Sequence, residues 1–183
     1  MMASFDPKTT LLVMALADES GNVFENAGLQ PLYTGIGQVK AATALTKALF
    51  ERKPTTIINL GTAGSFHLPQ GQCVECSGFI QRHGNVKGLS SSKILAPSFL
   101  TDLPKVICGT GDFVQTEKYP HEKMSFEIMD MEGYALAYVA QQFQIPFFSI
   151  KYISDNSNGD VIHDWKKNLI SSREKLLQIY LQF

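Results

Sequence analysis

The chain has 183 residues, enough for one domain with a substantial core. Its hydrophobic fraction of 44%, charged fraction of 18% and net charge of -1 are ordinary for a soluble protein and give no reason to expect nucleic acid as a partner. No stretch approaches the roughly 20 apolar residues that span a membrane, and the amino terminus lacks a signal-peptide pattern, so we expect a cytoplasmic protein with no membrane partner.

The first part of the chain predicts two strands separated by a helix. Residues 10–17 form an apolar run with polar flanks, which is typical of a buried strand. A glycine turn at 35–37 opens a predicted helix over 38–52. Its apolar face comprises Val39, Ala42, Leu45 and Leu49. Residues 55–60 are β-branched and apolar, and predict a second buried strand that runs into another glycine turn.

The rest of the chain continues the alternation. Further strands are predicted over 73–82, 106–108 and 146–154. Residues 127–131 lead into a predicted helix over 132–143, and an amphipathic helix is predicted over 161–180. The inward side of the latter comprises Ile162, Trp165, Leu169, Leu176 and Ile179. Strands that alternate with helices indicate a layered α/β fold, in which ligands bind beyond the carboxyl ends of the strands.

The three cysteines, Cys73, Cys76 and Cys108, are an odd number without a secretion signal, which favours reduced thiols. Cys73 and Cys76 lie three positions apart in a predicted strand, so they should point to opposite faces. No further cysteine or histidine pair completes a set of four zinc ligands. We therefore expect no metal site.

Acidic side chains follow three predicted strands. Asp18 and Glu19 come after the first strand, where a solvated turn is the simpler interpretation. Asp130 and Glu132 stand where a strand leads into a helix. Asp130 suits an N-cap, and Glu132 suits the first turn, where the helix dipole would keep it ionised as an acceptor for sugar hydroxyls. Asp155 ends a strand and fits a polar turn. Two carboxylates that flank a glycosidic bond divide the work, because one protonates the leaving group while the other activates water.

The glycine-rich turns match no cofactor motif. None has the spacing of a dinucleotide fingerprint or of a phosphate loop, so a dinucleotide or ATP site is poorly supported. A nucleophile elbow of the Gly-x-Ser-x-Gly type is missing as well, which argues against acyl transfer. We expect an enzyme without an organic cofactor.

Six segments in this order resemble one protein family. They are LVMALADE (12–19), TGIGQVKAA (34–42), INLGTAGS (58–65), GTGDF (109–113), DMEGYA (130–135) and IKYISDN (150–156). Together they resemble the nucleoside phosphorylase type I superfamily, and most of all its methylthioadenosine/S-adenosylhomocysteine nucleosidases. The resemblance implies one domain over 1–183, with a three-layer α/β/α fold around a twisted, mixed, partly barrel-like sheet. It also implies a homodimer and a purine nucleoside substrate.

The resemblance assigns the central roles. Glu19 matches the glutamate that activates the attacking water, and Asp155 matches the aspartate that protonates the purine at N7. Met131 and Glu132 match the pair that holds the ribose.

The same resemblance assigns the remainder of the site. Phe113 would stack on the base and Val114 would offer backbone bonds to it, although the loop after Asp112 is one residue short. Ser154 stands beside Asp155 at the base. Thr62 and Lys151 have supporting places, and Lys151 replaces an arginine near the ribose. Lysine keeps the charge and loses the fork geometry.

The 5′ substituent of the substrate would meet Ile36 and Trp165. Trp165 fits an ordinary core residue equally well, because it lies on the inward side of its predicted helix. The region between about 86 and 104 is shorter than in the relatives, where it lends apolar residues to the neighbouring subunit's 5′ pocket.

Hydrolysis is favoured over phosphorolysis by Asn59, which stands where phosphorylases have an arginine that clamps phosphate. The expected reaction is hydrolysis of the N-glycosidic bond of an adenine nucleoside with a modified 5′ position. Two alternatives stay open: a phosphorylase of the same superfamily, and a nucleoside-binding homologue without catalysis.

Overall fold

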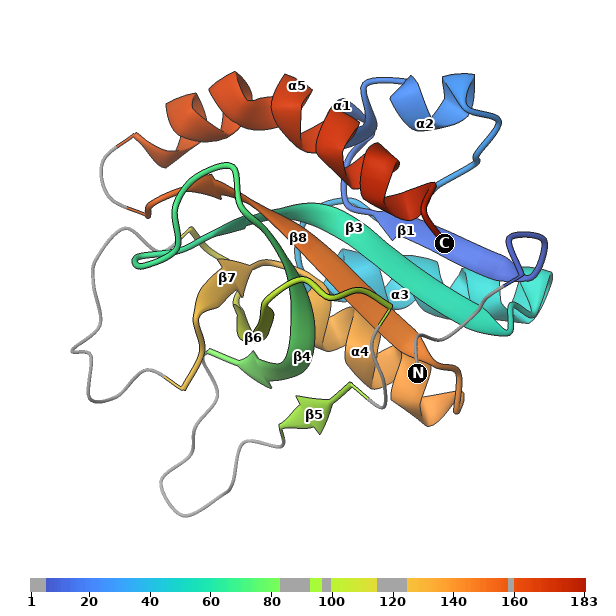
Figure 1. Cartoon of the computed structure of the whole chain (residues 1–183). Helices are drawn as coiled ribbons and strands as arrows, with labels where there is room; N and C mark the ends of the chain where they lie inside the picture. Colours follow the sequence, from blue (N-terminus) through green and yellow to red (C-terminus); the bar gives the residue numbers. More distant parts are fainter. Residues whose placement is uncertain (1–5, 83–92, 97–99, 115–124, 158–159) are drawn as a thin grey trace, which may run out of the picture.

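The computed structural model describes residues 6–82, 93–96, 100–114, 125–157 and 160–183 as a mixed sheet with helices on two sides (Figure 1). Its strands are β1 (Thr10–Met14), β2 (Leu32–Tyr33), β3 (Thr56–Gly64), β4 (Cys73–Gln81), β5 (Ile94–Leu95), β6 (Lys105–Thr110), β7 (Ile128–Asp130) and β8 (Phe147–Asp155). The helices are α1 (Ala17–Ser20), α2 (Val23–Asn26), α3 (Gln38–Arg52), α4 (Gly133–Gln142) and α5 (Val161–Tyr180).

The sheet closes on itself. Strands β3, β7, β6, β4 and β8 pair in that order, and β8 pairs again with β3. The β8 strand runs parallel to β3 and antiparallel to β4, and all of its residues are buried. Strands β1 and β2 extend the sheet beyond β3. The expected twisted, mixed and partly barrel-like sheet is therefore confirmed.

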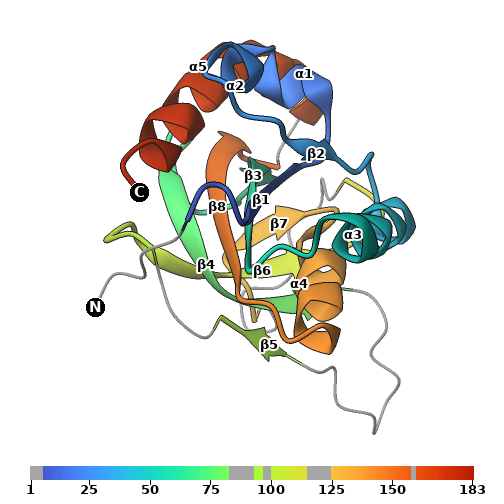
Figure 2. The ribbon, with the colours of Figure 1, turned by 90° about the vertical axis from the view of Figure 1, so that its right-hand side faces the viewer.

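Two apolar cores fill the space between the sheet and its helices. Helices α3 and α4 lie together on one side, while α1, α2 and α5 lie on another (Figure 2). Cys76 belongs to the core beneath α3 and α4, and Cys73 to the core beneath α2 and α5. The two thiols thus point to opposite faces, as the alternation along the strand predicts.

Several predicted boundaries and faces were wrong. The strand over 10–17 ends at Met14, and a short helix begins at Ala17. The strand over 55–60 continues to Gly64, because it pairs with β8 along its length. Val39 and Ile162 were expected inward, yet they are 79% and 61% exposed, since the buried stripes of both helices begin later in the chain.

None of the helices within the described ranges is long and apolar enough to cross a membrane. The same residues contain no group of histidine, cysteine or acidic side chains that could hold a metal ion.

Candidate active site

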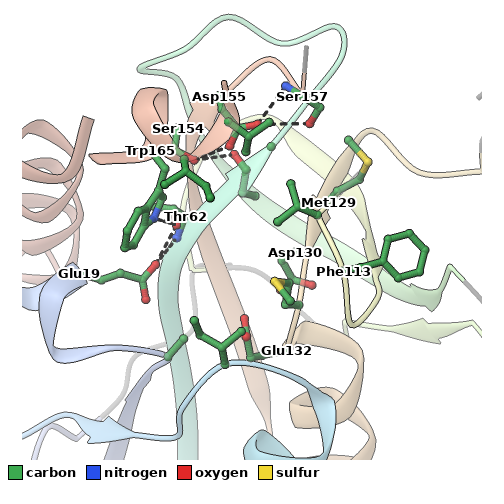
Figure 3. A pocket seen from close by; sticks show the side chains of 18 of the residues that line it. Glu19, Thr62, Phe113, Met129, Asp130, Glu132, Ser154, Asp155, Ser157 and Trp165 are labelled. Carbon is green, nitrogen blue, oxygen red and sulfur yellow. Dashed lines mark hydrogen bonds between the residues drawn. The ribbon is translucent and has the colours of Figure 1, made fainter. Parts of the chain in front are cut away.

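A pocket of about 430 Å³ opens at the carboxyl ends of the strands, within the usual range of roughly 300–1,000 Å³ for small-molecule sites. Every predicted site residue except Lys151 lines it. These lining residues are Glu19, Ile36, Thr62, Phe113, Val114, Met131, Glu132, Ser154, Asp155 and Trp165. In Figure 3, Glu19 and Trp165 lie on one side of the pocket and Phe113 on the other. The fold thus brings together segments that are far apart in the sequence.

Glu19 is buried in α1 and is held by three hydrogen bonds. Its Oε1 accepts from the backbone N–H of Thr62 at 3.1 Å and from the Thr62 hydroxyl at 2.8 Å. Its Oε2 accepts from the backbone N–H of Leu16 at 3.3 Å. Only 5% of Glu19 is exposed, so the interpretation of this acid as part of a solvated turn is wrong. Its carboxylate is fixed in place before any ligand binds.

Asp155 ends β8 and is held from both sides. The Ser154 hydroxyl donates to its Oδ2 at 2.9 Å, and the Ser157 backbone N–H donates to its Oδ1 at 2.9 Å. Ser157 reaches this position with a φ of 53°, a left-handed conformation that L-residues rarely adopt. Gly64 is required opposite, because a Cβ there would lie 2.7 Å from Asp155 Oδ1.

Glu132 occupies the N-cap position of α4, but its side chain makes no capping hydrogen bond to that helix. Its Oε1 instead accepts from the backbone N–H of Gly37 at 2.8 Å, which ties it to the glycine turn before α3. Burial, followed by the negative charge of Asp130, raises the pKa of Glu132 to about 8. The expectation that the helix dipole keeps Glu132 ionised is therefore wrong, because burial outweighs the dipole.

Lys151 does not line the pocket but forms a buried ion pair beside it. Its Nζ lies 3.0 Å from Asp130 Oδ2, and the two side chains are 3% and 1% exposed. Burial alone would lower the pKa of Lys151, but the charge of Asp130 outweighs this and raises it. The hydroxyl of Thr110 and the backbone N–H of Gly133 also donate to Asp130, at 2.6 and 2.9 Å. Asp130 lies at the end of β7, and its side chain binds the first backbone N–H of α4. This is the contact expected of a capping residue.

Two residues of this region were missed from the sequence. Asp112 accepts hydrogen bonds from the backbone and the side chain of Gln38, at 2.8 and 3.0 Å, and so anchors the start of α3. Arg82 lines the pocket, donates to the Phe113 carbonyl at 2.8 Å and lies over the Phe113 ring at 5.6 Å from its centroid. Asp112 stands in a recognisable motif after β6, whereas nothing in the local sequence singles out Arg82.

Glu132 should make the stability of the protein depend on pH. A carboxyl group whose pKa is raised on folding keeps its proton in the folded chain and loses it on unfolding between about pH 4.5 and 8. The contribution of Glu132 to the free energy of unfolding therefore falls as the pH rises through this window. Glu132→Gln cannot ionise, so its stability should fall less between about pH 5 and 8, as measured by urea unfolding.

The matched control is Glu51→Gln, because Glu51 is 59% exposed and only faces Lys47 at 4.0 Å. This variant should follow the pH dependence of the wild type. If the stability of Glu132→Gln also has the pH dependence of the wild type, Glu132 does not hold a proton in the folded protein.

Known proteins share both sequence and fold with this chain. Residues 104–183 match the family model described as the phosphorylase superfamily. The 5′-methylthioadenosine/S-adenosylhomocysteine nucleosidase of Shewanella oneidensis is 25% identical in an alignment that covers 94% of this chain and 89% of that protein. The corresponding nucleosidase of Shewanella sediminis is 27% identical, with 76% and 73% covered.

A solved structure has the same architecture. The nucleosidase of S. pneumoniae, in a complex with a transition-state inhibitor, superposes with a TM-score of 0.78 at 17% identity and covers 94% of this chain and 96% of its own. The resemblance of the six segments is thereby confirmed: residues 104–183 match the phosphorylase superfamily, and the chain is similar in sequence and fold to methylthioadenosine/S-adenosylhomocysteine nucleosidases.

Proposed function

We propose that this protein hydrolyses the N-glycosidic bond of a purine nucleoside, with 5′-modified adenine nucleosides such as methylthioadenosine or S-adenosylhomocysteine as substrates. One observation carries the proposal. Glu19 and Asp155, from α1 and the end of β8, line the same pocket as buried carboxylates held by hydrogen bonds. A nucleoside between them would have an acid at its base and a second acid near its anomeric carbon. The relatives named above act on such nucleosides.

The two acids divide the reaction. Glu19 takes a proton from water as the water oxygen bonds to C1′ of the ribose. The bond from C1′ to N9 breaks, and its electron pair passes to the purine. Asp155 delivers a proton to N7, so that the base leaves in a neutral form. The products are the free base and the ribose derivative.

The ribose and the base have their own contacts in this proposal. Met131 packs under the sugar. Glu132, whose Oε1 accepts a hydrogen bond from the Gly37 N–H, binds the hydroxyls of the sugar. Phe113, half exposed at the pocket mouth and backed by Arg82, stacks on the base beside Val114. Ser154 orients Asp155 through the bond to Oδ2.

The pocket suits hydrolysis better than phosphorolysis. Asn59 stands where a phosphate-clamping arginine would be needed, and it is 2% exposed. Its amide donates to the Val13 carbonyl at 3.2 Å and its oxygen accepts from Ser149 at 2.8 Å, so it serves the sheet. The pocket also contains the carboxylate of Glu19, which repels an attacking phosphate dianion.

An apolar wall next to Glu19 accounts for the modified 5′ position. It comprises Leu16, Ile36, Val161, Ile162 and Trp165. Trp165 belongs to neither apolar core of the described residues, which favours its place in the pocket over an ordinary core position. Transfer of a thioether substituent from water to such an apolar wall is favourable in free energy.

A homodimer in the cytoplasm completes the proposal. Phe50 of α3, Tyr138 of α4 and Phe143 directly after α4 are exposed, and the rings of Phe50 and Phe143 lie 5.5 Å apart. Exposed apolar patches of this kind are typical of protein interfaces. Sedimentation of the purified protein should give twice the mass of the 20.3 kDa chain, and a monomer at all concentrations would contradict the dimer.

A nucleoside panel, assayed with and without phosphate, tests the reaction. We expect free adenine and a free ribose derivative, with no dependence on phosphate. Glu19→Gln should still bind nucleoside and lose roughly 10²- to 10⁴-fold in kcat, because general base catalysis is lost, while Glu51→Gln keeps the activity. Formation of ribose 1-phosphate would instead indicate a phosphorylase. Binding without turnover in the wild type would indicate a non-catalytic homologue.

Asp155→Asn should separate leaving-group catalysis from binding. Adenine leaves poorly as an anion, so loss of the proton donor should lower kcat much more than it weakens the binding of the substrate. A nucleoside whose base leaves readily without protonation should lose far less. The ratio of kcat/KM for the two substrates, in both proteins, measures this effect. Equal losses on both substrates would mean that Asp155 orients the base without protonating it.

A further inference from the structure

Trp165 and Glu19 are joined through the side chain of Thr62. The indole N–H of Trp165 donates to Thr62 Oγ1 at 3.0 Å, and the Thr62 hydroxyl donates to Glu19 Oε1 at 2.8 Å. Both bonds are drawn in Figure 3. Because the three residues come from α5, β3 and α1, this chain of hydrogen bonds links the three elements at one wall of the pocket.

We propose that Trp165 is a positioning residue which, through Thr62, makes Glu19 Oε2 the oxygen that accepts the proton from water. The proposal rests on the hydrolysis proposed above. It assigns Trp165 a polar task in addition to its place in the apolar wall, and it assigns different tasks to the two oxygens of one carboxylate.

The direction of the bonds follows from the chemistry of the donors. An indole nitrogen only donates, and a threonine hydroxyl has a single proton. When the Trp165 N–H occupies a lone pair of Thr62 Oγ1, the hydroxyl proton is left to point toward an acceptor. Glu19 Oε1 is the acceptor within reach. Without the indole N–H, the hydroxyl could rotate and donate its hydrogen bond to another acceptor.

The two oxygens of Glu19 are consequently unequal. Oε1 accepts two hydrogen bonds from Thr62, one from its hydroxyl and one from its backbone, at 2.8 and 3.1 Å. Oε2 accepts one from the Leu16 backbone at 3.3 Å. A carboxylate oxygen has two lone pairs, so both lone pairs of Oε1 are occupied while Oε2 keeps one for a water molecule.

The backbone beside Glu19 carries no side chain at Gly61, where a Cβ would lie 3.5 Å from Oε1 and 3.9 Å from Oε2. Leu16, Glu19 and Trp165 all line the pocket, so a water in the pocket can reach the acid. The two donors on Oε1 and the single donor on Oε2 thus fit a base whose Oε2 accepts the proton.

The first experiment detects the hydrogen bond without any reaction. Trp165 is the only tryptophan of the chain, so its indole N–H gives one resonance in a ¹H–¹⁵N spectrum of the full-length protein. Thr62→Val should move this resonance upfield and speed its exchange with water, whereas Thr62→Ser should preserve both. Thr43→Val is the matched control, because the Thr43 hydroxyl only bonds to the Val39 carbonyl on α3. An unchanged resonance in Thr62→Val would overturn the proposal.

The second experiment tests the positioning. Trp165→Phe keeps an aromatic wall and removes the N–H, so it should lower kcat by roughly 2- to 10-fold and leave KM for adenosine nearly unchanged. Thr62→Val should cost more, and the double variant should be no worse than Thr62→Val alone, because both act through one chain of bonds. Thr62→Ser should restore kcat.

The outcomes keep this inference distinct from the proposed function. A loss confined to KM, or independent losses that multiply in the double variant, would show that Trp165 only touches the substrate. Absence of hydrolysis in the wild type would overturn the function and the catalytic role of Trp165 together. The indole resonance would then still decide whether the hydrogen bond exists.

Discussion

The buried ion pair between Lys151 and Asp130 is the interaction on which the site depends. It joins β8 to β7, and Asp130 also accepts from Thr110 of β6 and from the first backbone N–H of α4. Charges taken out of water are costly, and removing one partner of such a pair leaves the other uncompensated. Met131 and Glu132 follow Asp130 directly in the chain, so the pair anchors the segment to which they belong. The raised pKa of Glu132 has part of its cause in the same carboxylate.

Glycines at the site form turns, and they also avoid steric clashes with the carboxylates. A Cβ on Gly64 would lie 2.7 Å from Asp155, and one on Gly133 would lie 2.6 Å from Asp130. Neither distance is compatible with an ordinary side chain, because real Cβ atoms essentially never lie so close to another heavy atom. Each of these acids therefore needs a glycine opposite it. A sequence motif that contains both the acid and the glycine predicts the site better than the acid alone.

The alternation of strands and helices was predicted from the sequence pattern, whereas the mixed, barrel-like sheet and most of the site residues were implied by the family resemblance. Ten of the eleven predicted site residues line the pocket, and other lining residues such as Arg82 and Met129 were not predicted. Strong periodicity carries the first kind of information, and the glycine and acid motifs at strand ends carry the second. Short elements such as α1 and β2 escaped prediction, since a few residues show no period. The pKa of Glu132 and the contact of Arg82 with Phe113 could not be foreseen, because they arise from segments brought together only by the fold. The same is true of the partner of Lys151, which is Asp130 and not Glu132.

The place of β8 in the sheet has a consequence for how the chain folds as it is synthesised. This strand fills the gap between β3 and β4, although both precede it by many residues. Until β8 leaves the ribosome, β3 and β4 present unpaired edges with apolar faces, which invite association with other chains. Pairing across such sequence separations also slows folding, because long loops must close first. A nascent chain of this protein would therefore gain from a chaperone that shields those edges until the barrel closes.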